Sequence, residues 1–379
     1  MRIGFVSNVI YPYITGGAEK RIHEIGTRLA DRGHEVTVYG RHFWDGPTEI
    51  THEGMTLRAV APEADLYAED RRSITEAIDF AARAFPPLRR RLRNNEHDVI
   101  VASVFPYFPV LSTKLASLRT DTPLVTTWHE VWGDYWEEYL SRLAPFGKVT
   151  ERVTARTPQH PTAISAITAD RLAAIGPDRE DIEIVPNGID VEQVRTAPLP
   201  DQGYDVLFAG RLIEHKNVDV LLEAGDAGAA EHDATLGVIG DGPERDRLDA
   251  QRDALAHADR VDFLGFLDDY EDVLGHMRAA DVFASPSTRE GFGITFLEAM
   301  AADCTVIAAD HPESAADEVI ADAGFLVEPT VDALAERLDA ALGGARPPTS
   351  PVDHARQYDW DAIAEQAETA YQRAIDGKW

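Results

Sequence analysis

Apolar and polar positions along this chain follow two different periods. Short apolar runs rich in β-branched residues recur between longer stretches with apolar residues at helical spacing. In the first half these patterns predict strands at 2–7, 35–39, 98–103 and 123–127, and helices at 17–32 and 73–94. In the second half they predict strands at 204–209, 234–239, 260–264, 281–284 and 304–308, and helices at 217–224, 243–257, 293–301 and 331–342. Such alternation is typical of parallel sheets with helices on both faces.

The length of 379 residues suits two domains better than one open sheet with this many strands. A stretch rich in turn residues at 186–203 is interpreted as the linker between them. We therefore expect an α/β fold with two doubly wound, Rossmann-like domains, at 1–185 and 204–358. Ligands of such sheets bind beyond the carboxyl ends of the strands, and the cleft between two domains is the expected site.

Two loops that follow predicted strands carry residues suited to phosphate. Gly16 and Gly17 open a helix, where free N–H groups and the helix dipole favour an anion, although an ordinary flexible loop fits equally well. Arg211 and Lys216 follow the first strand of the second half, where they could hold a pyrophosphate. The alternative is two solvated surface cations, with Asn217 capping the next helix.

The segment 287–298 carries the strongest pattern of polar residues. It follows a predicted strand, and its glycines lead into a helix N-terminus, which favours anions. Glu290 precedes this helix and Glu298 lies inside it, so the two carboxylates could accept hydrogen bonds from sugar hydroxyls on either side of a phosphate. The alternative is one acid that complements the helix dipole and one solvated acid.

The spacing of these acids resembles that of a known family. Glu290 and Glu298 are separated by seven residues, as in the E-x7-E element of the GT4 family of retaining glycosyltransferases, which have the GT-B fold. Other segments resemble signatures of this family, in its order and over nearly the whole chain: Gly16-Gly17-Ala18-Glu19, Arg32-Gly33-His34-Glu35-Val36, Pro186-Asn187-Gly188-Ile189-Asp190, Gly210-Arg211-Leu212 with Lys216-Asn217, and Gly240-Asp241-Gly242-Pro243. The resemblance implies an acceptor-side domain at 1–185, completed by a C-terminal helix at 359–379, and a nucleotide-sugar domain at 204–358.

The resemblance also implies roles for charged residues of the second domain. Arg211 and Lys216 would clamp the diphosphate of the nucleotide-sugar donor and offset charge on the departing nucleotide. Glu290 would bind hydroxyls of the transferred sugar, and Glu298 would bind the ribose. Stabilising the leaving group in this way lowers the barrier to transfer.

Backbone and ring positions receive roles from the same resemblance. The N–H groups near Phe292, Gly293 and Ile294 would hold phosphate, and Gly16 and Gly17 would close over the pyrophosphate. Gly265 and Phe266 would flank the base. His129 matches the family's histidine that faces the donor sugar, although a lone histidine is more often structural.

The resemblance implies transfer with retained configuration along a front-face path, in which the donor phosphate helps to deprotonate the acceptor. No protein nucleophile or general base is assigned, so Arg211, Lys216, Glu290 and His129 are the candidate catalytic residues. We expect no cofactor and no essential metal. Asp359-Trp360-Asp361 directly precedes a predicted helix, which favours a helix cap over a metal site.

The charge of the chain limits its partners and its environment. Lys and Arg number 36 and Asp and Glu 66, a net charge of −30 that opposes nucleic acid as a partner. Few lysines and many acids are typical of salt-adapted proteins, so we expect stability to fall in low salt, as melting temperatures in molar and millimolar salt would show. The single Cys304 fits a reducing compartment, and no apolar run approaches the roughly 18 residues that span a bilayer. We expect a cytoplasmic protein, soluble or peripheral to the membrane.

The segment 81–94 stands out in this acidic chain because it contains five arginines. Together with an aromatic cluster at 128–139, it could contact anionic lipid or a lipid-phosphate acceptor. The alternatives are a solvated helix face for the arginines and ordinary packing for the aromatic residues. We favour these alternatives over a membrane contact.

These expectations converge on a retaining glycosyltransferase that moves a hexosyl unit from a nucleotide-diphosphate sugar to a glycan or lipid-linked acceptor. A nucleotide-sugar epimerase of the same fold would need no acceptor. A non-catalytic sugar-nucleotide-binding subunit would bind the donor without turnover. The sequence leaves the base, the sugar, the acceptor and the linkage open.

Overall fold

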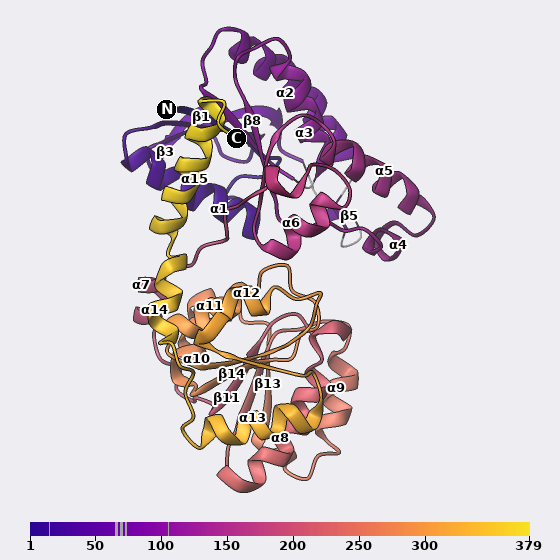
Figure 1. Cartoon of the computed structure of the whole chain (residues 1–379), viewed down its shortest axis with the longest axis vertical. Helices are drawn as coiled ribbons and strands as arrows, with labels where there is room; N and C mark the ends of the chain where they lie inside the picture. Colours follow the sequence, from indigo (N-terminus) through magenta and orange to yellow (C-terminus); the bar gives the residue numbers. More distant parts are fainter. Residues whose placement is uncertain (15, 65–66, 69–70, 73, 105) are drawn as a thin grey trace. The chain divides into compact units, whose positions relative to one another are not determined.

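The computed structural model of the chain describes residues 1–14, 16–64, 67–68, 71–72, 74–104 and 106–379. It divides into two compact units, which Figure 1 shows with the sequence colouring. Unit 1 comprises Met1–Pro186 and Trp360–Trp379, and unit 2 comprises Asn187–Asp359. Each unit has its own sheet, parallel in unit 2 and parallel except for one edge hairpin in unit 1, which confirms the expected α/β fold with two Rossmann-like domains.

The sheet of unit 1 has the strand order β10-β9-β8-β7-β1-β2-β4-β3. All pairs are parallel except β3 with β4, which form an antiparallel hairpin at one edge. The strands are β1 (Arg2–Val6), β2 (Glu35–His42), β3 (Glu49–His52), β4 (Met55–Pro62), β7 (Val99–Ser103), β8 (Leu124–Trp128), β9 (His160–Ala163) and β10 (Glu183–Ile184). The strand order reverses between β1 and β7, which is where such a sheet binds ligands.

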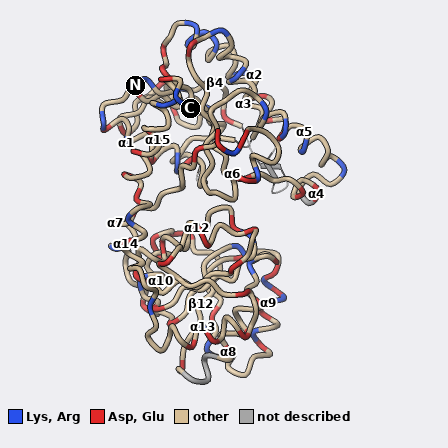
Figure 2. The backbone as a smooth tube through the Cα atoms, viewed as in Figure 1, with Lys and Arg blue, Asp and Glu red and all other residues tan. Residues whose placement is uncertain are grey.

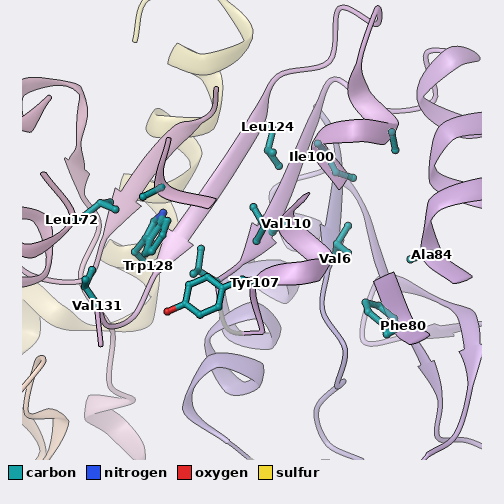
Figure 3. Close-up of a cluster of buried hydrophobic side chains, with 14 of the residues drawn as sticks. Val6, Phe80, Ala84, Ile100, Tyr107, Val110, Leu124, Trp128, Val131 and Leu172 are labelled. Atoms are coloured by element: carbon teal, nitrogen blue, oxygen red, sulfur yellow. The ribbon is translucent and has the colours of Figure 1, made fainter. Parts of the chain in front are cut away.

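Helices cover both faces of this sheet. They are α1 (Gly17–Asp31), α2 (Ile74–Arg93), α3 (Tyr107–Ser117), α4 (Tyr135–Leu140), α5 (Ala144–Ala155), α6 (Ala166–Ala173) and α15 (Trp360–Ile375). Two further short strands, β5 (Tyr67–Ala68) and β6 (Arg71–Arg72), pair with each other in antiparallel orientation. Helix α2 occupies the predicted helix 73–94, of which residue 73 lies outside the described residues. Alternate strand residues point to opposite faces, so Ile100 belongs to the core under α2 and α3 (Figure 3), whereas Val99 and Val101 belong to the core under α1 and α15.

The C-terminal helix α15 packs on α1 in unit 1. Trp360, Ile363 and Tyr371 are buried in the core that α1 also covers. At the rim, Arg28 Nε lies 2.7 Å from Asp361 Oδ1 and Arg32 Nη1 lies 3.0 Å from Glu368 Oε2. Apolar burial is the main attachment, because exposed ion pairs contribute little stability.

The sheet of unit 2 is entirely parallel, in the order β13-β12-β11-β14-β15-β16. Its strands are β11 (Val206–Ala209), β12 (Leu236–Ile239), β13 (Val261–Gly265), β14 (Val282–Ser285), β15 (Thr305–Ala309) and β16 (Phe325–Val327). Its helices are α7 (Val191–Thr196), α8 (Val218–His232), α9 (Arg245–Arg252), α10 (Tyr270–Ala279), α11 (Ile294–Ala301), α12 (Ala316–Ile320), α13 (Val331–Leu342) and α14 (Pro351–Ala355). The strand order reverses between β11 and β14, so the loops after these two strands meet at the switch point.

The segment expected to be a linker at 186–203 needs correction. Residues from Asn187 onward group with unit 2, and they include helix α7. Asp190 caps this helix by accepting a hydrogen bond from Gln193 N at 2.8 Å, and Val191 and Val194 are buried. Turn residues indicated an irregular segment, but these two apolar positions dock α7 against α10 and α11.

Among the described residues, no helix is both long enough and apolar enough to cross a bilayer. Figure 2 shows acidic positions distributed over both units.

Candidate functional site

The loops that follow β11 and β14 are joined by hydrogen bonds at the switch point of unit 2. Asn217 Nδ2 donates to Pro286 O at 2.9 Å, and Thr288 N donates to His215 O at 2.9 Å. Asn217 itself has a positive φ of 50°, a conformation that asparagine tolerates well. The two loops therefore hold each other in place before any ligand binds.

This junction brings Lys216 and Glu290 together. Lys216 Nζ forms an ion pair with Glu290 Oε1, and the two side chains are 17% and 12% exposed. Glu290 is also fixed through its backbone, because Ala315 N in the loop after β15 donates to Glu290 O at 3.0 Å. The low exposure of both charges strengthens their interaction relative to a surface pair.

Arg211 lies in the same loop as Lys216 but is exposed. Within the described part of the chain its side chain forms no hydrogen bond or ion pair. The loop that carries it packs closely on the loop after β12, where Gly240 has a φ of 127° and an added Cβ would lie 1.9 Å from Gly210 O. Both this backbone conformation and this close contact require glycine at position 240. The packing fixes the backbone of the loop from which the Arg211 side chain extends into solvent.

The N-terminus of α11 follows directly after Glu290. Gly293 caps the helix with a φ of 82°, and an added Cβ would lie 2.5 Å from the Phe296 ring. Phe292 is buried with its ring centroid 6.0 Å from that of Tyr358, and Ile294 begins the helix. The first N–H groups of a helix have no intrahelical acceptor, so this turn favours an anion.

Glu298 is located one helical turn further along α11 and is buried. Its Oε1 accepts a hydrogen bond from the hydroxyl of Tyr270, the first residue of α10. Burial first, and then the charge of Glu298, raise the pKa of Tyr270. The sequence analysis did not identify Tyr270, because the acidic residues around it are typical of a loop. Asp269 could have indicated that a helix begins at Tyr270, since it caps α10 by accepting a hydrogen bond from Glu271 N at 2.9 Å.

Gly265 and Phe266 lie at the carboxyl end of β13. Gly265 has a φ of 74°, and its carbonyl accepts a hydrogen bond from Gly240 N at 2.8 Å. The Phe266 side chain is 74% exposed, an unusual position for a phenyl ring. An exposed ring at the ligand-binding edge of a sheet can stack on a flat ring of a ligand.

The other three candidate residues belong to unit 1. Gly16 caps α1 in an extended conformation, and an added Cβ would lie 2.3 Å from Glu19 Oε2, whereas Gly17 has open space. His129 follows β8, and its Nε2 is 3.1 Å from Ser103 Oγ at the end of β7. The sheet therefore brings His129 to the carboxyl edge, where a ligand of unit 1 is expected.

Potential metal ligands lie elsewhere. Asp359 Oδ2 accepts from Val191 N at 3.3 Å, whereas Asp361 pairs with Arg28, so the two carboxylates serve different contacts. A group that could hold a metal ion is found in unit 1, where His23 on α1 meets His52 and Glu53 of the β3–β4 hairpin. His23 Nε2 is 3.2 Å from Glu53 Oε2.

The arginines of α2, whose basic positions Figure 2 marks in blue, are largely used within unit 1. Arg83 pairs with Asp79, Arg91 pairs with Glu96, and Arg89 donates to Ala116 O at 2.8 Å. Arg90 and Arg93 are exposed, with no partner among the residues described.

The two sheets and the position of the switch point define a class of fold. The solved structure of Anabaena HepE in complex with UDP and glucose matches the chain with a TM-score of 0.67 and 22% identity, covering 98% of this chain and 100% of that one. Both units therefore have the architecture of GT-B glycosyltransferases, and the expected fold is confirmed.

The family follows from sequence. The model of Glycosyltransferase Family 4 matches residues 15–193, and that of Glycosyl transferases group 1 matches residues 191–358. A phosphatidyl-myo-inositol mannosyltransferase of Mycobacterium leprae is 35% identical over 400 residues, 98% of this chain and 96% of the relative. A 2-deoxystreptamine N-acetyl-D-glucosaminyltransferase of Streptomyces fradiae is 29% identical over 75% of this chain and 72% of its own. The chain belongs to the GT4 family and is a glycosyltransferase, which confirms the resemblance.

Proposed function

We propose that this glycosyltransferase moves a hexosyl unit from a nucleotide-diphosphate sugar to a glycan or lipid-linked acceptor, with retention and without a metal. The observation that carries the proposal is the Lys216–Glu290 ion pair where the loops after β11 and β14 meet. The names of the relatives support it, since one is a mannosyltransferase of phosphatidyl-myo-inositol and a structural neighbour holds UDP and glucose.

The donor would lie along the carboxyl edge of unit 2. Arg211 offers a guanidinium fork, and Lys216 has three N–H donors, so Lys216 can keep Glu290 and also bind a phosphate oxygen. The N–H groups at Phe292, Gly293 and Ile294 would complete the diphosphate site. Because these groups supply the positive charge, the proposal needs no metal.

The remaining polar groups would orient the nucleoside and the sugar. Glu290, fixed by Lys216 and by its own backbone, would accept hydrogen bonds from hydroxyls of the transferred hexose. Glu298 would accept from the ribose, held in position by Tyr270, and Gly265 and Phe266 would flank the base. From unit 1, Gly16 and Gly17 would face the pyrophosphate and His129 the donor sugar.

The chemical step breaks the bond between the anomeric carbon and the donor phosphate oxygen. Its electron pair goes to that oxygen, and the acceptor hydroxyl forms the new bond on the same face of the sugar. The acceptor proton passes to the departing diphosphate. Arg211, Lys216 and the α11 dipole stabilise the charge that develops on this leaving group, and configuration is retained.

A peripheral membrane contact through 81–94 would rest on Arg90 and Arg93, because the other three arginines bind within unit 1. The location of the enzyme on a cytoplasmic membrane face therefore needs support from another surface.

The donor is identified by thermal shift with UDP-, GDP-, ADP- and dTDP-sugars in buffer containing EDTA. We expect one nucleotide class to raise the melting temperature of the wild type, and Lys216→Ala to abolish that rise. Lys378→Ala, at a position 71% exposed, is the control and should leave it unchanged. Stabilisation that Lys216→Ala leaves intact would contradict the proposed site.

Turnover with the identified donor separates the rivals. A transferase forms product only when an acceptor is present. Conversion of the donor sugar without acceptor would indicate an epimerase, and donor binding with no turnover across broad acceptor mixtures would indicate a binding subunit.

A further inference from the structure

Unit 1 contains an apolar pocket that the proposed donor chemistry does not use. It lies between the start of α2, the start of α3 and the helices α4 and α5, and it holds about 440 Å³ of empty space, part of it open to solvent. Ala77, Tyr107, Phe108, Trp136, Tyr139 and Phe146 form much of its wall. Figure 3 shows Tyr107 beside Trp128 in the core beneath it.

Two hydroxyl groups of the wall are engaged within the protein. The Tyr107 hydroxyl donates to Glu151 Oε1 at 2.7 Å, and Thr150 Oγ1 donates to Phe146 O at 2.9 Å. Glu151 is itself buried, and it also accepts from Trp132 N at 2.8 Å. A sugar needs several hydrogen-bond partners in its site, so a pocket of this composition fits hydrocarbon instead.

The pocket borders the ligand edge of the sheet. Pro106 lines it and also lines a smaller cavity whose polar residues are Ser7, Asn8, Ser103 and the buried acid Glu19, an acceptor for hydroxyl groups. Ser103 is the residue whose hydroxyl contacts His129. A molecule with a polar head near Ser103 could therefore place an apolar tail between α3 and α5.

The outer side of the same region exposes apolar side chains. Leu143, Phe146, Val149 and Val153 are 61%, 50%, 58% and 51% exposed, and they recur at a spacing of three or four residues along α5 and the turn before it. We call these four residues the α5 apolar face. Phe146 belongs to both the face and the pocket wall, so the two surfaces are continuous. An apolar cluster of this kind on a chain with a net charge of −30 marks a contact surface.

Charges of both signs lie beside the α5 apolar face, and among the described residues the unpaired ones on α5 and the turns at its two ends are arginines. Arg142, Arg152 and Arg156 are exposed and form no ion pair among the residues that the structure describes. Lys148 lies between them and is neutralised by two exposed acids of the preceding segment, Asp134 at 2.6 Å and Glu137 at 2.8 Å. Glu151, the acid within α5, is buried. Exposed cations around an apolar face complement an anionic lipid surface.

We propose that this pocket receives the hydrocarbon chain of an anionic lipid acceptor, which enters from a bilayer on which the α5 apolar face rests. The proposal names the acceptor class and therefore rests on the proposed transferase function. It moves the membrane contact from the arginines of 81–94, which are mostly paired, to α5.

The pocket is tested by calorimetric titration with hexyl, octyl and decyl phosphate below their micelle concentrations. Each buried methylene should lower the dissociation constant about fourfold until the pocket is filled. Ala77→Leu, which fills the pocket, should weaken decyl phosphate binding at least tenfold, and Phe146→Asp, at a half-exposed position, should do the same if Ala77→Leu does not fold. Affinity that does not depend on chain length would overturn the proposal.

The surface is tested by sedimentation with phosphatidylglycerol and phosphatidylcholine vesicles. Val149→Asp, which lies outside the pocket wall, should abolish sedimentation with the anionic vesicles and leave decyl phosphate binding unchanged. Leu199→Asp is the matched control in unit 2, because Leu199 is 61% exposed, close to the 58% of Val149. Equal sedimentation of the wild type and Val149→Asp would overturn the membrane contact. The donor thermal shift of each variant keeps this outcome separate from failure of the proposed function.

Discussion

The two units differ in the residues that they place at the ligand-binding edges of their sheets. In unit 2 the loops after β11 and β14 are joined by one backbone hydrogen bond and by one from the Asn217 side chain, and they hold the Lys216–Glu290 pair. In unit 1 the edge continues into α4 and α5, which line an apolar and aromatic pocket and carry the α5 apolar face. A charged diphosphate needs fixed polar partners, whereas a hydrocarbon chain needs only shape and exclusion of water. The contrast teaches that one fold can present two chemistries by changing the segments that connect its strands to the next helices.

The largest expected effect comes from separating the two charges of unit 2. Glu290→Gln removes the carboxylate but leaves Lys216 free for phosphate, so we expect transfer to fall about 10²- to 10³-fold while nucleotide diphosphate binding is kept or strengthened. Lys216→Met should weaken nucleotide binding as well as transfer. Steady-state kinetics and calorimetry with the donor found by thermal shift measure both quantities. Parallel loss of affinity in the two variants would show that the pair acts as one structural unit.

The loops that carry this pair show what the sequence could predict. The strands β11 and β14 were predicted to within two residues, so Arg211, Lys216 and Glu290 were placed in the correct loops. The contact between Lys216 and Glu290 was not predicted, since it joins residues 74 positions apart and depends on the strand order. A strand order is fixed by packing between whole elements, which a single sequence does not display.

In unit 1 the sequence analysis missed whole elements near the ligand edge, and not only a contact between them. Gly133, Pro145 and Gly147 interrupt the helical pattern, so the sequence indicated an aromatic cluster but not α4 and α5. Gly147 is there for packing, because an added Cβ would lie 2.3 Å from the Trp136 ring. Likewise, the arginines of 81–94 are conspicuous in the sequence, but their partners Asp79 and Glu96 become evident only in the fold.

The prediction of intermediate size concerns folding stability at low pH, which should fall in unit 1 because of His97. Burial lowers the pKa of His97 in unit 1 to about 4, from 6.5, and Tyr39 Oη lies 2.6 Å from its Nε2. The folded state therefore favours neutral His97. Its contribution is fully present above pH 6.5 and is lost as the pH falls toward 4, by about 3 kcal/mol in total.

His97→Asn tests this because it removes the titration and keeps a polar side chain at the site. Urea unfolding at pH 7.5 and pH 4 should show a smaller acid-induced loss in the variant than in the wild type. His232→Asn in unit 2, where the side chain is 28% exposed, is the matched control. Equal acid sensitivity of His97→Asn and the wild type would place the acid-labile group elsewhere.

The smallest effect concerns a ring in unit 2 that is more exposed than any residue of the α5 apolar face in unit 1. Phe266 is 74% exposed, but it stands at the end of β13 beside polar loops. Stacking of a base on an aromatic side chain contributes about 1–3 kcal/mol, so Phe266→Ala should weaken nucleotide binding about tenfold, whereas Phe266→Trp should preserve it. Neither change should alter sedimentation with vesicles, because Phe266 does not belong to the α5 apolar face. Calorimetry and sedimentation on the same samples decide the matter: loss of vesicle binding in Phe266→Ala would mean that exposed apolar side chains serve the same purpose in both units.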